Sequence, residues 1–154
     1  MSGVRQERPR LMIAGFALLL LAMSPAHGQT AAEAASGLAA FNGTWKTEFH
    51  GHAFVILHLS EKDQKLIGSC THSRSINWGR DGELTIVSDE TTEDKVLDAR
   101  MSESKLVVKI ANAESPEDVV TIELKLTGTD QAEGRLLNLP PDTPKQKPWL
   151  FKRS

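Results

Sequence analysis

The sequence FNGTWKTEFH, residues 41–50, predicts the first strand of a β-sheet and decides the fold. Its side chains Trp45, Thr47 and Phe49 alternate with charged or ionisable residues, as they do in a strand with one face on a core. Gly43, two positions before the tryptophan, allows the chain to bend sharply into the strand and leaves room for the indole ring. We therefore expect the folded domain to begin at about residue 41.

The rest of the chain repeats this alternation in short segments. From residue 41 to residue 154, turn-forming residues separate these segments at intervals of roughly eight to twelve residues, which is typical of an all-β sandwich or barrel. Leu106, Val108 and Ile110 give the clearest alternation. The spacing predicts one all-β domain, residues 41–154, built as an antiparallel meander of about eight to ten strands. We expect residues 149–153 to be the last strand and to close a barrel by pairing with the first.

Residues 1–28 have the three parts of a secretory signal peptide. Three arginines form a basic leader, and residues 11–23 form an apolar run that is too short for a transmembrane helix. Residues 24–28 supply the break and the small residues that a signal peptidase requires. An uncleaved membrane anchor is the alternative interpretation. We expect an exported protein, periplasmic or secreted, in which the Ala-rich residues 29–40 form a flexible tether.

Charge and cysteine content limit the kinds of partner and of stabilisation. The chain has 18 basic and 20 acidic residues. Without residues 1–28, which hold three arginines and one glutamate, 15 basic and 19 acidic residues remain, a formal charge of −4. This mildly acidic balance argues against nucleic acid as a partner. Cys70 is the only cysteine, so no intrachain disulfide can form and stability must come from packing and sheet closure.

A cluster of acidic residues precedes the predicted strand at residues 95–101. It lacks the spacing of a calcium-binding loop, and we interpret it as a solvated loop. Its members are Asp89, Glu90, Glu93 and Asp94.

Three parts of the sequence follow one another in an order that is found in a known group of β-barrel proteins. They are the tripeptide Gly43-Thr44-Trp45, the hairpin of residues 54–68 and the closing sequence WLFKR of residues 149–153. In this layout the chain resembles the calycin group, which includes lipocalins, avidins and small exported bacterial lipocalin-like domains. The resemblance implies a lipocalin-like barrel in which Trp45 plugs the closed end. It also implies that Arg153 or Lys152 on the last strand covers the tryptophan ring in a cation–π contact.

An eight-stranded barrel is just wide enough to hold one small ligand, so we interpret the protein as a binding module for a small apolar molecule. The inward-facing residues would either line a cavity or fill a core, and both alternatives stay open. They are Trp45, Phe49, Val55, Leu57, Leu106, Val108, Ile122 and Leu124. We do not expect an enzyme or a cofactor, because no Ser-His-Asp set is visible and the acidic residues of the strands occur singly.

The alternative function is an interaction or structural module of the cell envelope with a filled core and no ligand. Its contact surface would contain Phe54, Ile56 and Val107, which the alternation places on the outer face.

His50, His52, Cys70 and His72 are the nearest approach to a chemical constellation in this chain. If the first hairpin turns at Gly51 and the second at residues 63–64, all four reach the same rim of the barrel. Sulfur and imidazole ligands together suit zinc or copper. The other interpretation, which we favour, is that the histidines are hydrated rim residues and the thiol is a buried apolar group.

The N-terminal pattern predicts where the exported chain begins. Expression in a bacterium with its secretion machinery should yield a protein that starts at Gln29, because the small residues that end at Gly28 suit signal peptidase. Intact mass and N-terminal sequencing of the periplasmic fraction measure this directly. A full-length chain that stays in the membrane fraction would support the uncleaved anchor instead.

Overall fold

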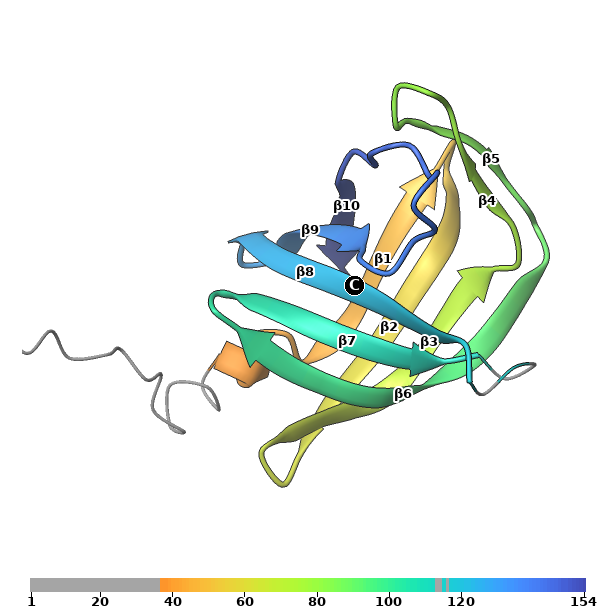
Figure 1. Cartoon of the computed structure of the whole chain (residues 1–154). Helices are drawn as coiled ribbons and strands as arrows, with labels where there is room; N and C mark the ends of the chain where they lie inside the picture. Colours follow the sequence, from red (N-terminus) through yellow and green to blue (C-terminus); the bar gives the residue numbers. More distant parts are fainter. Residues whose placement is uncertain (1–36, 113–114, 116) are drawn as a thin grey trace, which may run out of the picture.

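The computed structural model describes residues 37–112, 115 and 117–154 (Figure 1). The expected signal peptide, residues 1–28, and residues 29–36 of the expected tether lie outside the described residues. Within the described ranges, no helix is long and apolar enough to cross a membrane. These ranges contain ten strands: β1 Gly43–Phe49, β2 His52–Lys62, β3 Lys65–Ser73, β4 Ile76–Trp78, β5 Leu84–Val87, β6 Thr91–Ser102, β7 Lys105–Ala111, β8 Val119–Gly128, β9 Gln131–Leu136 and β10 Trp149–Arg153.

Eight of the strands form one closed antiparallel barrel in the order β1-β10-β9-β8-β7-β6-β3-β2. The two short strands β4 and β5 pair only with each other and form a hairpin between β3 and β6. The predicted all-β fold, an antiparallel meander closed into a barrel, is confirmed. The barrel is compatible with the lipocalin-like layout that the sequence resembles.

The last strand closes the barrel as the sequence predicted. In the register of β1 and β10, Trp45 lies opposite Arg153 and Lys46 opposite Lys152. The backbone N–H of Ser154 adds a hydrogen bond of 2.9 Å to the carbonyl oxygen of Thr44. Closure removes the exposed edges that an open sheet of this size would present to other chains.

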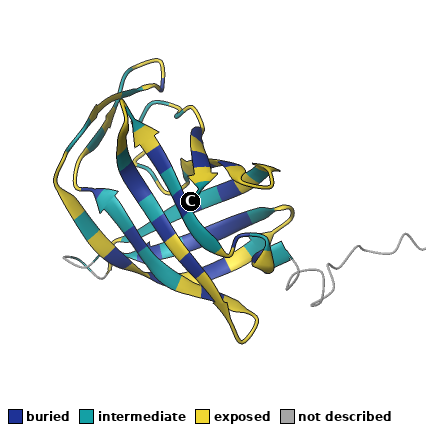
Figure 2. Cartoon of the chain, turned by 180° about the vertical axis from the view of Figure 1, so that it is seen from behind, coloured by how far each residue is buried: buried dark blue, intermediate teal, exposed yellow. Residues whose placement is uncertain are grey.

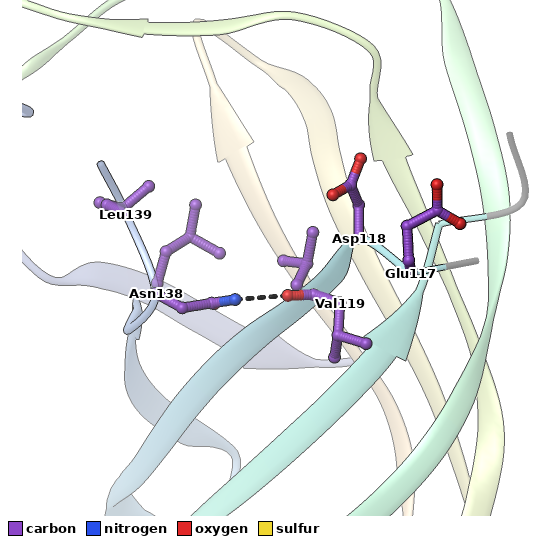
Figure 3. Close-up of a pocket in the computed structure, with 7 residues that line it drawn as sticks. Glu117, Asp118, Val119, Asn138 and Leu139 are labelled. Carbon is purple, nitrogen blue, oxygen red and sulfur yellow. Dashed lines mark hydrogen bonds between the residues drawn. The ribbon is translucent and has the colours of Figure 1, made fainter. Parts of the chain in front are cut away.

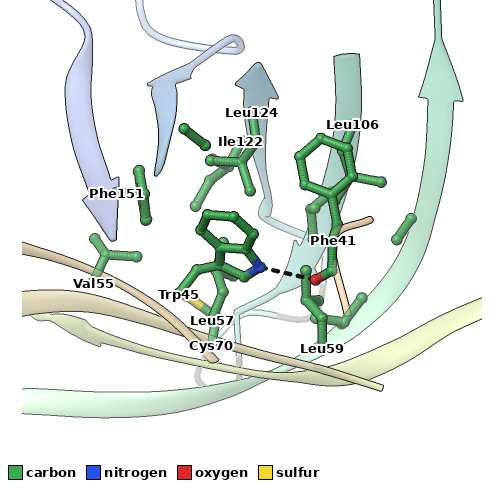
Figure 4. Close-up of a cluster of buried hydrophobic side chains, with 14 of the residues drawn as sticks. Phe41, Trp45, Val55, Leu57, Leu59, Cys70, Leu106, Ile122, Leu124 and Phe151 are labelled. Carbon is green, nitrogen blue, oxygen red and sulfur yellow. Dashed lines mark hydrogen bonds between the residues drawn. The ribbon is translucent and has the colours of Figure 1, made fainter. Parts of the chain in front are cut away.

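One end of the barrel is filled around Trp45, whose side chain is fully buried (Figure 4). Its indole nitrogen donates a hydrogen bond of 2.8 Å to the carbonyl oxygen of Phe41. The guanidinium carbon of Arg153 lies 4.5 Å from the centroid of the indole ring, which is the contact that the resemblance implied. Gly43 has φ +125°, a backbone conformation that favours glycine, and the chain turns there into β1.

The N-terminal residues of the described chain belong to this filled end. Leu38 is buried in the core, although the sequence placed it in the flexible tether. The guanidinium of Arg153 donates hydrogen bonds to the carbonyl oxygens of Ala40, at 2.5 Å, and Asn42, at 2.8 Å. Residues 37–42 are therefore tied to the last strand of the barrel.

Buried and exposed residues alternate along most strands (Figure 2), but a β-bulge changes the expected facing in β2. Thr47 lies opposite Val55 and Glu48 opposite Ala53, so Phe54 is the extra residue of the bulge. The assignment of Phe54 to the outer face was wrong: it is 1% exposed, and its ring lies edge-on to Trp149 with centroids 5.2 Å apart. The outer contact surface that the alternation suggested therefore lacks its largest residue.

The acidic cluster was expected to be a solvated loop, and this is wrong for its C-terminal half. Glu93 and Asp94 lie in β6, which begins at Thr91. The alternation turns the side chain of Asp94 inward, where it is only 1% exposed. The sequence pattern missed this strand because charged residues occupy both of its faces there.

Barrel closure predicts how a shortened chain behaves. Deleting residues 149–154 should abolish cooperative unfolding, because it exposes Trp45 and leaves β1 and β9 as free sheet edges. Urea denaturation followed by circular dichroism measures the transition. The matched control is Leu150→Lys, a change at an outward position of β10 that is 48% exposed, which should keep a cooperative transition. A truncated protein that unfolds like the complete one would show that β10 is dispensable.

Candidate functional site

A pocket of about 260 Å³ lies inside the barrel at the end away from the filled core around Trp45. Six aliphatic side chains form its apolar walls, and two tryptophans and several polar residues complete it. Ile76 comes from β4, and the other aliphatic residues come from four barrel strands: Val55, Ile110, Val120, Ile122 and Leu136. The barrel is thus packed solid at one end and hollow at the other.

The eight inward-facing residues named from the sequence divide between these two ends. Val55 and Ile122 line the pocket. Five others are fully buried in the filled end and do not line it, namely Trp45, Leu57, Leu106, Val108 and Leu124 (Figure 4). Phe49 is only partly buried and stacks on the imidazole of His50, with ring centroids 4.0 Å apart.

Trp78 from β4 and Trp149 from β10 lie side by side at the pocket. Their ring planes are within 3° of parallel and their centroids are 6.2 Å apart. The sequence predicts that Trp149 begins the last strand, but the pattern gives no sign that it lies at a pocket. Trp78 follows a weakly patterned segment, and alternation alone could not have assigned it to the interior.

The β4–β5 hairpin that carries Trp78 is held in place by the segment before β10 (Figure 1). The backbone N–H of Lys147 donates a hydrogen bond of 3.1 Å to the carbonyl oxygen of Gly82, and its ammonium lies 2.5 Å from a carboxylate oxygen of Glu83. Gly82 has φ +79°, and a Cβ atom added there would lie 2.0 Å from the carbonyl oxygen of Lys145. Only glycine fits this turn without displacing the segment that it contacts.

His72 is one of the polar residues of the pocket wall, and it pairs with the buried Asp94, which does not line the pocket. The Nε2 atom of His72 lies 2.8 Å from Oδ2 of Asp94, and its Nδ1 atom lies 3.0 Å from the carbonyl oxygen of Ser73. Both ring nitrogens thus have a polar neighbour within hydrogen-bond distance, and neither is free for a metal ion or a substrate proton while these contacts persist.

Cys70 is buried next to this pair, and its thiol is unreactive at neutral pH. Burial raises the pKa of its thiol to about 12, and the negative charge of Asp94 adds to the shift. The thiolate is the form of cysteine that attacks electrophiles and binds metals. At neutral pH this side chain therefore acts as a small apolar group.

The structure does not bring the four residues of the expected metal site together. Cys70 and His72 face the pocket inside the barrel, whereas His50 and His52 line a separate hollow of about 370 Å³ at the outer rim. In the described ranges, no three His, Cys, Asp or Glu side chains gather as they would around a metal ion. The hairpins do return to the same end of the barrel, where Val55 of β2 pairs with His72 of β3, but the two pairs line different hollows.

A larger hollow of about 440 Å³ adjoins the pocket and shares Val120 and Leu136 with it. It lies at the surface, with Glu117 and Asp118 on one side and Leu139 on the other (Figure 3). The side-chain amide of Asn138 donates to the carbonyl oxygen of Val119 and accepts a hydrogen bond of 2.8 Å from the backbone N–H of Thr121. These bonds fasten the segment after β9 to the beginning of β8.

Comparison of the chain with protein-family models, curated proteins and solved structures found no match.

The raised pKa of Cys70 predicts a loss of stability at alkaline pH. The folded state keeps the thiol proton up to pH about 12, whereas the unfolded chain releases it near the ordinary pKa of a thiol, 9.0. The stabilising contribution is thus complete below pH 9 and is lost as the pH rises towards 12. Between these values, the free energy of unfolding should fall more steeply in the wild type than in Cys70→Ala, by up to about 1.4 kcal/mol per pH unit.

Urea denaturation at several pH values between 8 and 11 measures both proteins. The comparison with Cys70→Ala removes the contributions of lysines and other groups that titrate in both. Parallel stability curves would contradict the burial of a protonated thiol.

Proposed function

We propose that this protein binds a small, mostly apolar molecule in the pocket of its barrel. The observation that carries the proposal is the unequal filling of the interior. Large side chains pack one end, and a hollow of about 260 Å³ with aliphatic and aromatic walls occupies the other. Protein interiors usually leave few voids larger than a water molecule, so a hollow of this size inside so small a barrel supports a binding role.

The size of the pocket limits the ligand. Most small-molecule sites enclose about 300–1,000 Å³. This pocket lies just below that range, so it suits a compact molecule or one end of a longer one. Burying about 200 Å² of apolar ligand surface contributes roughly 5 kcal/mol, part of which offsets the freedom that the ligand loses. Moderate affinity for compact apolar molecules follows.

The chemistry of the polar residues also supports binding rather than catalysis. Both ring nitrogens of His72 are engaged, so the imidazole cannot act as a general base while its pairs are intact. The thiol of Cys70 keeps its proton at neutral pH, because burial raises its pKa to about 12. We propose that these residues shape the wall of a binding site.

We also propose that the protein works outside the cytoplasm. The basic leader, the short apolar run and the small residues up to Gly28 support this location. A single buried cysteine and a closed barrel, which needs no disulfide, suit that environment.

The proposal predicts binding of an apolar fluorescent probe. N-phenyl-1-naphthylamine should bind with saturation and with one site per chain, and it should brighten as it leaves water. Val120→Trp should weaken this binding about tenfold, because the larger side chain enters the pocket and overpacking typically costs 1–3 kcal/mol.

The matched control is Leu97→Trp, which adds an indole to the outer face of β6, at a position that is 54% exposed. It should leave the affinity unchanged. Equal weakening in both variants, or unsaturable binding in the wild type, would contradict a defined internal site.

A further inference from the structure

We propose that the ligand of this pocket carries a hydrogen-bond acceptor, a carbonyl or carboxylate oxygen, which the indole N–H groups of Trp78 and Trp149 bind. This inference rests on the proposed binding function and names the class of ligand. The structure supports it through two donors at the pocket whose hydrogen-bonding capacity is unused.

The indole nitrogens of Trp78 and Trp149 are both buried, and neither has a hydrogen-bond partner among the described residues. Trp149 as a whole is only 6% exposed. An indole N–H can donate but cannot accept, and a buried donor without a partner costs free energy. Both residues line the same pocket, so an acceptor bound there would offset this cost at two positions.

The third tryptophan provides a comparison within the chain. The indole nitrogen of Trp45 is also buried, and it donates to the carbonyl oxygen of Phe41 at 2.8 Å (Figure 4). The fold thus supplies an internal acceptor for the tryptophan of its filled end. It supplies none from the described residues for the two tryptophans at the pocket.

The other polar groups of the pocket are already engaged. His72 bonds to Ser73 and Asp94, and the thiol of Cys70 is a weak donor. Arg74 and Asn112 also line the pocket, and each has an interaction of its own. Among the buried side-chain donors that line the pocket, the indole nitrogens of Trp78 and Trp149 lack a partner within the described residues, and such donors select an acceptor. The apolar part of the same molecule would contact Val55, Ile110 and Ile122.

A pair of ligands with the same shape separates the acceptor from the apolar body. 1-Acetonaphthone has a carbonyl oxygen, and 1-ethylnaphthalene has nearly the same shape without one. Calorimetric titration of the protein should show that the ketone binds about 5- to 10-fold more tightly, which is the range expected for a net hydrogen bond. 1-Naphthoate, tested beside them, shows whether a charged acceptor is preferred to a neutral one.

Nuclear magnetic resonance of the ¹⁵N-labelled protein observes the donors directly. The ketone should shift the indole N–H signals of Trp78 and Trp149 and leave that of Trp45 in place. Trp78→Phe and Trp149→Phe keep an aromatic ring but remove the N–H. In these variants the ratio of the affinity for the ketone to the affinity for the hydrocarbon should fall towards one. The affinity for 1-ethylnaphthalene itself should change by a smaller factor than this ratio. The signal that each variant loses also assigns the spectrum.

The outcomes separate this inference from the proposed function. Equal affinity for ketone and hydrocarbon, with unchanged indole signals, would overturn the inference and leave the binding pocket intact. Indole protons that contact a long-lived water in the free protein and keep it in the ketone complex would also overturn it. Failure of every naphthalene ligand and of the fluorescent probe to bind would instead refute the proposed function, and this inference with it.

Discussion

The contact between Arg153 and Trp45 joins three parts of the chain that are far apart in sequence. The guanidinium covers the indole ring of β1 and donates to the carbonyl oxygens of Ala40 and Asn42, while its backbone belongs to the closing strand. A cation–π contact contributes about 0.5–2 kcal/mol, depending on its exposure to solvent, and hydrogen bonds from a charged group contribute about 1.5–3 kcal/mol each. Closure of the barrel, burial of the tryptophan and docking of residues 37–42 thus depend on one side chain.

Because this contact secures one end, the other end of the barrel need not be packed solid. Phe54 and Trp149 meet edge to face between the two ends, and beyond them the walls are aliphatic and leave a hollow. The β-bulge in β2 contributes to this division, since it brings Phe54 to the inner face beside Val55. A regular strand would have placed that ring outside the barrel.

Alternation in the sequence predicted the strands, the closure and the inner face, because a side chain in a strand points either to the core or away from it. It did not predict depth along the barrel axis. Leu57 and Val55 share one face of β2, yet only Val55 reaches the pocket.

Phe54 was misassigned because a bulge leaves no local mark in the pattern. Asp94 was misassigned because its partner, His72, is on a strand distant in sequence. The metal hypothesis could not foresee that His50 and His52 line one hollow while Cys70 and His72 line another.

The hairpin that carries Trp78 and the segment that carries Lys147 meet over the pocket through one backbone hydrogen bond and one ion pair whose side chains are both 56% exposed. An exposed ion pair contributes little to stability and is weakened by salt. The barrel strands, by contrast, are joined by continuous ladders of hydrogen bonds. Separating the hairpin from this segment therefore costs much less than opening the barrel, and this cost falls further as the ionic strength rises.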